Sequence, residues 1–148
     1  MANNEEINII KDFLGIGLIK CDYKRSFDAL APISFFACAN ASNDRDSKIA
    51  DLTIKVDIKF ENNDVSSFIF LAQFILTKAD AFKKLADDQK QMAIKTMFSI
   101  SFPFARQTIT NLMTDSFGTI QLPLINILRV ADITKGVVFL RGKSTQEK

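Results

Sequence analysis

The segment ADLTIKVDIKF, from Ala50 to Phe60, alternates apolar and polar residues more regularly than any other part of the chain. The apolar side chains fall on one side and the polar ones on the other: Leu52, Ile54, Val56, Ile58 and Phe60 against Thr53, Lys55, Asp57 and Lys59. This period of two predicts a β-strand with one buried face. The polar sequence ENND follows and predicts a tight turn into another strand. The chain therefore contains an antiparallel sheet.

The strand after this turn, VSSFIFLAQFIL, is apolar on both faces. One face carries Ile69, Leu71 and Ile75, interrupted by Gln73, and the other carries Phe68, Phe70, Ala72, Phe74 and Leu76. A strand that is apolar on both faces is covered on both faces. The helix expected after it covers only one side of a small sheet, so we expect Ile69, Leu71 and Ile75 to form an oligomer interface. Alternatively, the N-terminal or C-terminal segment of the chain covers this face.

Two further strands precede this pair. GLIKCDYKRSF alternates, with Ile19, Cys21, Tyr23 and Phe27 expected on the buried face, and ISFFACANA follows Pro32. Residues 17–78 thus predict a four-stranded antiparallel meander. Residues 1–14 carry only a weak helical pattern and are expected to form a flexible arm.

Residues 87–114 carry apolar residues every three or four positions, which predicts a helix packed on one face of the sheet. Asp87 and Asp88 suit its start, where negative charge meets the helix dipole. Pro103 lies inside the run and predicts a break near Ser101 and Phe102. The predicted class is therefore α+β, a four-stranded sheet with one long, Pro-broken helix.

The segment after this helix, DSFGTIQLPLINIL, contains Gly118 and Pro123 and is expected to run extended against the body. Residues 127–141 are ambiguous, with Gly136 as a candidate boundary between a short helix and a final apolar stretch, VVFL, and residues 143–148 are expected to be a disordered tail. All 148 residues are interpreted as a single domain.

The composition excludes several classes of protein. There is no histidine, which removes Ser-His and Cys-His nucleophile pairs and most zinc sites. No glycine-rich phosphate loop is present, since GIG at Gly15–Gly17 is only a turn signal, and a formal charge of +2 does not favour nucleic acid. We therefore expect no enzyme, no cofactor and no metal site. The main positive clue is the content of fourteen phenylalanines.

The cellular location of the protein is inferred from three features of the sequence. The first residues, MANNEEINII, are acidic and polar, unlike a secretory signal, and no apolar run is long enough to cross a bilayer. Cys21 and Cys38 lie in apolar-patterned segments and are expected to be reduced packing residues. These features predict a cytoplasmic protein without membrane insertion.

Three short motifs resemble the SecB family of bacterial preprotein-export chaperones. The helix carries Ser101-Phe102-Pro103-Phe104-Ala105-Arg106, where the family has L-F-P-Y-A-R. The following FGTIQLPLINI aligns without a gap with the family's F-P-Q-L-N-L-A-P-V-N-F. Ser26-Phe27-Asp28-Ala29 matches the family's S-F-E-A at the end of the first strand. The resemblance spans about residues 15–128.

This resemblance implies a sheet with helices on one face, assembled as a dimer of dimers. It also implies ATP-independent binding of unfolded or non-native polypeptides in apolar grooves, for which phenylalanine supplies large, sequence-tolerant contacts. One of Phe102 and Phe104 would pack on the sheet and the other would line a groove, unless both are core; Arg106 is expected to cap a carbonyl or pair with a carboxylate. The polypeptide-binding groove implied by the resemblance comprises Phe102, Phe104, Phe117, Ile120, Leu122, Leu124 and Phe27.

The chain departs from the family in two places. The strand FIFLAQ has no carboxylate where the family carries one, and the tail RGKSTQEK has no Cys or His where many members bind zinc. The residues that would support the family's SecA and zinc contacts are therefore missing here. A dedicated chaperone of one client, such as an antitoxin, is an alternative to an export chaperone. A non-chaperone oligomeric scaffold and, less well supported, a small-ligand binding module are others.

Overall fold

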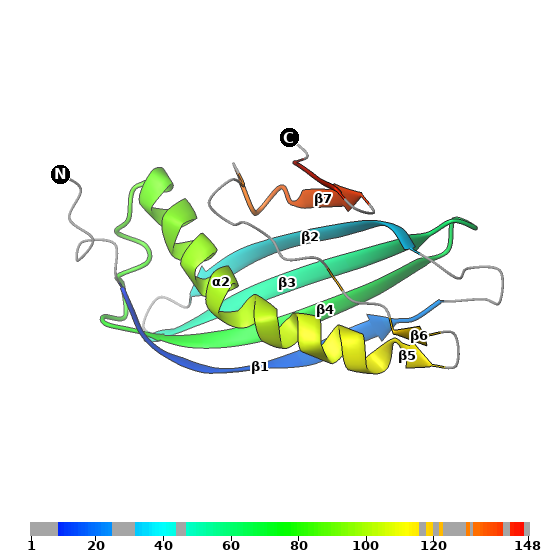
Figure 1. The fold of residues 1–148 in the computed structure, drawn as a ribbon. Coiled ribbons are helices and arrows are strands. Elements are labelled where there is room, and N and C mark those ends of the chain that lie inside the picture. Colours follow the sequence, from blue (N-terminus) through cyan, green and yellow to red (C-terminus); the bar gives the residue numbers. More distant parts are fainter. Residues whose placement is uncertain are drawn as a thin grey trace.

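The computed structural model describes residues 9–24, 32–43, 47–115, 118–119, 122, 130, 132–140 and 143–146, with the side chains of 115, 118–119, 139–140 and 143–146 excluded. In the described part of the chain, one long helix lies on one face of an antiparallel sheet (Figure 1). The elements are β1 (Ile10–Asp22), β2 (Pro32–Asn43), β3 (Ile49–Phe60), β4 (Val65–Leu76), α2 (Asp87–Leu112), β5 (Thr114–Asp115), β6 (Gly118–Thr119), β7 (Val137–Leu140) and β8 (Lys143–Gln146). The predicted α+β class, with a helix packed on an antiparallel sheet, is confirmed.

The strand order is β1-β4-β3-β2-β7-β8, and β5 and β6 form a separate two-stranded ribbon. The expected four-stranded meander is therefore wrong in two respects. The first strand lies beside β4 rather than β2, in the manner of a Greek key, and the sheet has six strands among the residues described. Periodicity identifies strands but does not specify which of them are neighbours.

The ends of the chain also differ from expectation. Strand β1 begins at Ile10, so residues 10–14 of the expected arm are sheet, and Ile10 pairs with Leu76 of β4. At the other end, β8 pairs with β7 where a disordered tail was expected. In both segments an existing sheet edge supplies hydrogen bonds that local sequence signals do not reveal.

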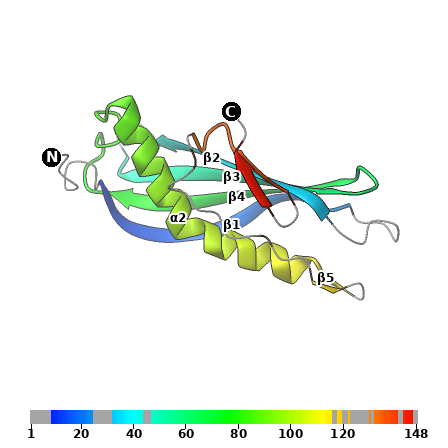
Figure 2. The same cartoon turned by 45° about the horizontal axis from the view of Figure 1, so that its top comes forward.

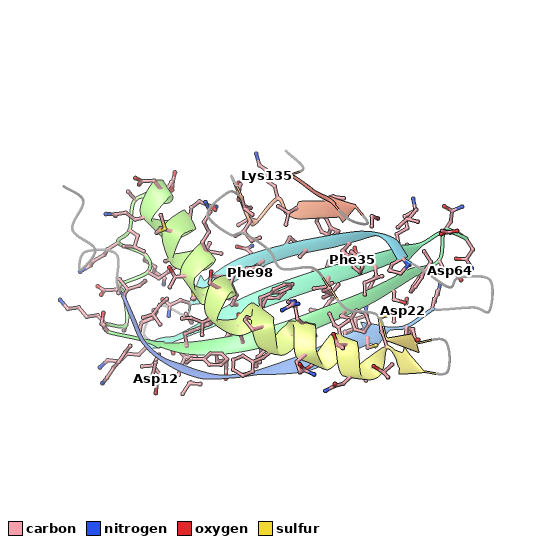
Figure 3. All side chains as sticks on the ribbon, viewed as in Figure 1. Asp12, Asp22, Phe35, Asp64, Phe98 and Lys135 are labelled. Carbon is pink, nitrogen blue, oxygen red and sulfur yellow. The ribbon has the colours of Figure 1, made fainter. Side chains whose placement is uncertain are left out.

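The alternation of β3 and β4 places the core under α2. The side chains on this inner face are buried: Leu52, Ile54, Val56, Ile58, Phe60, Phe68, Phe70, Ala72, Phe74 and Leu76. From α2, Phe98 lies between helix and sheet (Figure 3) and stacks on Phe102 with ring centroids 4.7 Å apart. The predicted inner faces of β3 and β4 are confirmed.

The helix α2 starts at Asp87 as predicted, but it runs without a break through Pro103. A proline removes the hydrogen bond to the carbonyl four residues earlier, here that of Ser99. Ser99 and Pro103 are both exposed, so water can satisfy the freed carbonyl. The helix changes direction in its middle instead of splitting (Figures 1 and 2).

A tight turn leads into β7. Asp132 accepts hydrogen bonds from the Thr134 amide (2.9 Å), the Thr134 hydroxyl and the Gln91 side chain (3.0 Å). Gly136 has a φ of +92°, and a Cβ there would meet the Phe36 ring and the Ala37 carbonyl. The turn places β7 beside β2 (Figure 1) and gives the undecided segment 127–141 a strand at its end.

Candidate functional site

A stacked aromatic pair, with one ring exposed and the other half-buried, joins α2 to strand β1. Phe104 is 53 % exposed, and its ring stacks on Phe13 of β1 with centroids 5.6 Å apart. The Phe13 ring in turn contacts Phe74 of β4 at 5.1 Å. We call Phe13 and Phe104 the aromatic ledge. Through the contact with Phe74, the ledge extends the apolar packing of the core to the surface beside β1.

The helix explains why the two neighbouring phenylalanines have different surroundings. Phe102 is 5 % exposed and packs in the core against Phe98, whereas Phe104 lies at the surface. Two residues along an α-helix turn the side chain by about 200°, so a continuous helix separates them without the predicted break. Phe102 fits the expectation that one of the two packs on the sheet, whereas the expectation that the other lines a groove stays a prediction.

Leu122 is held next to the same helix. Its side chain is buried, and its carbonyl accepts hydrogen bonds from Arg106 Nε (3.3 Å) and Arg106 Nη2 (2.9 Å). The expectation that Arg106 would cap a carbonyl is confirmed. The remaining predicted groove residues lie outside the described part of the chain: Phe27, Phe117, Ile120 and Leu124.

The opposite face of the sheet has a hollow of about 300 Å³ at β1 and β4. We call it the β1 hollow, and its lining consists of Leu14, Gly15, Ile16, Gly17, Ile19, Leu71 and Gln73. A Cβ built on Gly15 or Gly17 would meet nothing within 4 Å, so the missing side chains leave this space open. In the sequence these glycines indicate only a turn, and no local pattern predicts the hollow.

The predicted oligomer-interface residues lie on this outer face. Ile69, Leu71 and Ile75 are half-buried there, and Leu71 also lines the β1 hollow. On β1 the predicted buried face is wrong, because Ile16 and Leu18 pair with inner-face residues of β4 while Ile19 is 60 % exposed. Register shifts along β1 change which side chains face the helix, and a period-two pattern does not anticipate them.

The two cysteines differ in their surroundings. Cys21 is exposed, against the expectation that it is a packing residue, although it pairs with the inner-face residue Phe68 near the end of β1. Cys38 is half-buried on β2, and burial raises the pKa of its thiol. A raised pKa favours the protonated thiol, which is a poor nucleophile.

The described residues contain no cluster of His, Cys, Asp or Glu suited to a metal ion. No helix in the described part of the chain is both long and apolar enough to span a membrane. The described surface has apolar contact area on both sides of β1. The aromatic ledge lies on the helix side, and the β1 hollow lies on the other side.

A comparison with models of known protein families finds no match, and neither does a comparison with curated protein sequences. Solved structures do match. One is a SecB-like chaperone of Mycobacterium tuberculosis in complex with a ChAD peptide from the HigA1 antitoxin, with a TM-score of 0.51 and 11 % identity. The match covers 83 % of this chain and 92 % of that chain. This chain therefore has a SecB-like fold, in agreement with the resemblance of its sequence motifs.

Proposed function

We propose that the protein is an ATP-independent chaperone that binds non-native polypeptides. The observation that carries this proposal is the aromatic ledge, where Phe104 keeps 53 % of its surface exposed while stacked on Phe13. A phenylalanine fixed by stacking offers a large apolar contact at little entropic cost. The SecB-like fold supports the same function, because the similar M. tuberculosis protein binds a peptide.

The test is binding of a permanently unfolded polypeptide, together with suppression of its aggregation. We expect Phe104→Ala to weaken binding by about tenfold, since it removes most of the exposed ring area. Met92→Ala is the matched control, because Met92 is a large exposed side chain elsewhere on α2. Equal binding by wild type and Phe104→Ala would contradict the role of the ledge, and absence of binding by wild type would contradict the function.

A dedicated chaperone of one client is the second candidate. It is favoured by the similar structure, whose peptide comes from an antitoxin. The two candidates differ in selectivity: a general holdase suppresses aggregation of several unrelated unfolded proteins with comparable affinity. A dedicated chaperone protects a single partner and leaves the others to aggregate.

Protein export and assembly into an oligomer are two separate proposals, and each needs its own test. Delivery of clients to SecA is the less supported one, because β4 carries no carboxylate on its outer face. We further propose that the protein is cytoplasmic and forms a homo-oligomer, a tetramer of the SecB kind, whose interface covers Ile69, Leu71 and Ile75. Light scattering on the purified protein tests the assembly: a tetramer supports it, and a monomer contradicts the predicted interface. An oligomer that binds no unfolded polypeptide would instead favour the non-chaperone scaffold or the dedicated chaperone of one client.

A further inference from the structure

Strand β7 occupies the edge of β2 that β3 leaves open. On one side β2 pairs with β3 over Pro32–Asn43, and on the other side β7 pairs with Ser34–Ala37. One more hydrogen bond continues the contact with this part of the chain, because the Ala39 amide donates to the Ile133 carbonyl at 3.0 Å. A later segment of the same chain therefore covers this edge of β2 (Figure 1).

The sequence of β2 is unsuited to an exposed edge. Its twelve residues, PISFFACANASN, carry no charge, and its register with β3 is regular from Ser34 onward. Charges, bulges and prolines keep natural edge strands from pairing with other chains, and β2 has only Pro32 at its first position. The other long strand without charge, β4, lies between β1 and β3. Without β7, an uncharged and regular strand would end the sheet.

Strands β7 and β8, which we call the C-terminal hairpin, replace this edge with a polar one. Strand β7, VVFL, is uncharged and lies between β2 and β8. Strand β8, KSTQ, is short, contains no apolar residue and begins with Lys143. A short outer strand with a lysine disfavours pairing with another chain. The order of the strands thus places the charge-free sequences inside the sheet.

The C-terminal hairpin is seated on β2 by a close contact at Gly136. Its φ of +92° is rare for other residues, and a Cβ there would meet the Phe36 ring and the Ala37 carbonyl oxygen. Just before it, Ile133 is fully buried, and Asp132 accepts a hydrogen bond from Gln91 of α2. The start of the hairpin is therefore attached to both the sheet and the helix, and a side chain at position 136 would push it away from β2.

We propose that the C-terminal hairpin acts as a strap that closes the β2 edge against a second copy of this chain. While the hairpin is in place, its backbone takes the hydrogen bonds that β2 would offer to another strand. When the hairpin is lifted, the uncharged edge of β2 pairs with β2 of a second copy. This inference concerns self-assembly and does not depend on the proposed chaperone function.

Gly136→Val tests the strap in the full chain. We expect the added side chain to lift β7, so that the Ala39 amide loses its protection from hydrogen exchange while the amides of β3 and β4 keep theirs. Light scattering should then show a mass that grows with concentration beyond that of the wild type. Ser42→Val is the matched control, because it adds the same side chain at an exposed position of β2 beyond the pairing with β7. The control should behave as the wild type does.

A disulfide between the hairpin and β2 separates opening from unfolding. Ser34 and Leu140 lie directly opposite each other. Because the Ala39 amide points toward the hairpin, alternation along β2 makes Ser34 part of a non-hydrogen-bonded pair, whose Cα atoms lie about 4.5 Å apart, within the range for a disulfide. Ser34→Cys and Leu140→Cys are added to the Gly136→Val chain together with Cys21→Ser and Cys38→Ala. Oxidation should return the mass to that of the wild type, and reduction should restore its growth.

Growth in mass on opening, reversed by the disulfide, supports the proposal. If the Ala39 amide exchanges freely in Gly136→Val but the mass stays that of the wild type, the β2 edge needs no strap and the proposal is wrong. It is also wrong if the oxidised chain still grows in mass, or if the amides of β3 and β4 lose protection together with Ala39, because self-association then follows from unfolding.

A second variant opens the hairpin by another route if the Ala39 amide stays protected in Gly136→Val. Ile133→Asp places a charge at a fully buried position of the segment that leads into β7. Exchange of the Ala39 amide with a growth in mass would then support the strap. Exchange without a growth in mass would overturn it.

Discussion

Residue type alone does not predict whether a phenylalanine of this protein lies in the core or at the surface. Phe98 and Phe104 lie on the same helix, yet one is 1 % exposed and the other 53 %. Helical periodicity places Phe98 on the apolar face of α2, whereas Phe104, six residues later, lies about 240° further around the helix and outside that face. The sequence therefore predicted the buried face of the helix, but the stacking of Phe104 on Phe13 is found only in the structure.

This difference predicts losses of stability of different size for two alanine substitutions. Phe98→Ala should lower the free energy of unfolding by about 3–5 kcal/mol, because it removes a buried ring and leaves a cavity. Phe104→Ala should cost about 1 kcal/mol, because much of its ring is already in water. Urea unfolding of both variants measures the difference. Similar losses for the two would mean that the ledge is part of the core.

Among the strands, alternation of apolar and polar residues correctly predicted the inner faces of β3 and β4, but it did not predict the buried face of β1. Strand β1 has three register shifts, and each moves the following side chains relative to the sheet faces. The start and the approximate end of α2 followed from its first acidic turn and its apolar spacing. The pairing of β1 with β4 and the addition of β7 and β8 depend on contacts between distant residues, which local patterns do not contain.

The continuity of α2 through Pro103 gives a prediction for the helix. Replacing Pro103 with alanine restores an amide that can donate to the Ser99 carbonyl, at an exposed position. We expect Pro103→Ala to raise the free energy of unfolding by about 2 kcal/mol, after allowance for the greater freedom of the unfolded chain. Circular dichroism during urea unfolding measures it. A loss of stability would show instead that the bend is required for packing on the sheet.

The stability of the whole molecule should respond to acid through Asp132. Hydrogen bonds from the Thr134 side chain, then from the Thr134 amide and from Gln91, hold the pKa of Asp132 below its usual value of 3.8. A group whose pKa is lower in the folded state stabilises the fold above the unfolded-state pKa, and this contribution is lost as the pH falls through the folded-state pKa. The stabilisation is therefore complete above pH 3.8 and disappears below it.

Asp132→Asn isolates this effect, because it keeps an oxygen acceptor but cannot ionise. The wild type should be more stable than the variant at neutral pH, and the two should converge as the pH falls below 3.8. Thermal unfolding across this range measures the difference. A difference that does not change with pH would mean that the turn is stabilised by geometry rather than by charge.

The position of β1 in the sheet has a consequence for how the protein is made. Strand β1 leaves the ribosome first, but its partner β4 follows only after β2 and β3. Translation adds roughly 5–20 residues per second, so the nascent β1 waits for several seconds with apolar residues unpaired. Its glycines and its flanking charges disfavour pairing with other nascent chains during that time. The glycines and charges at the edge of the folded sheet thus also disfavour wrong pairing of β1 in the nascent chain.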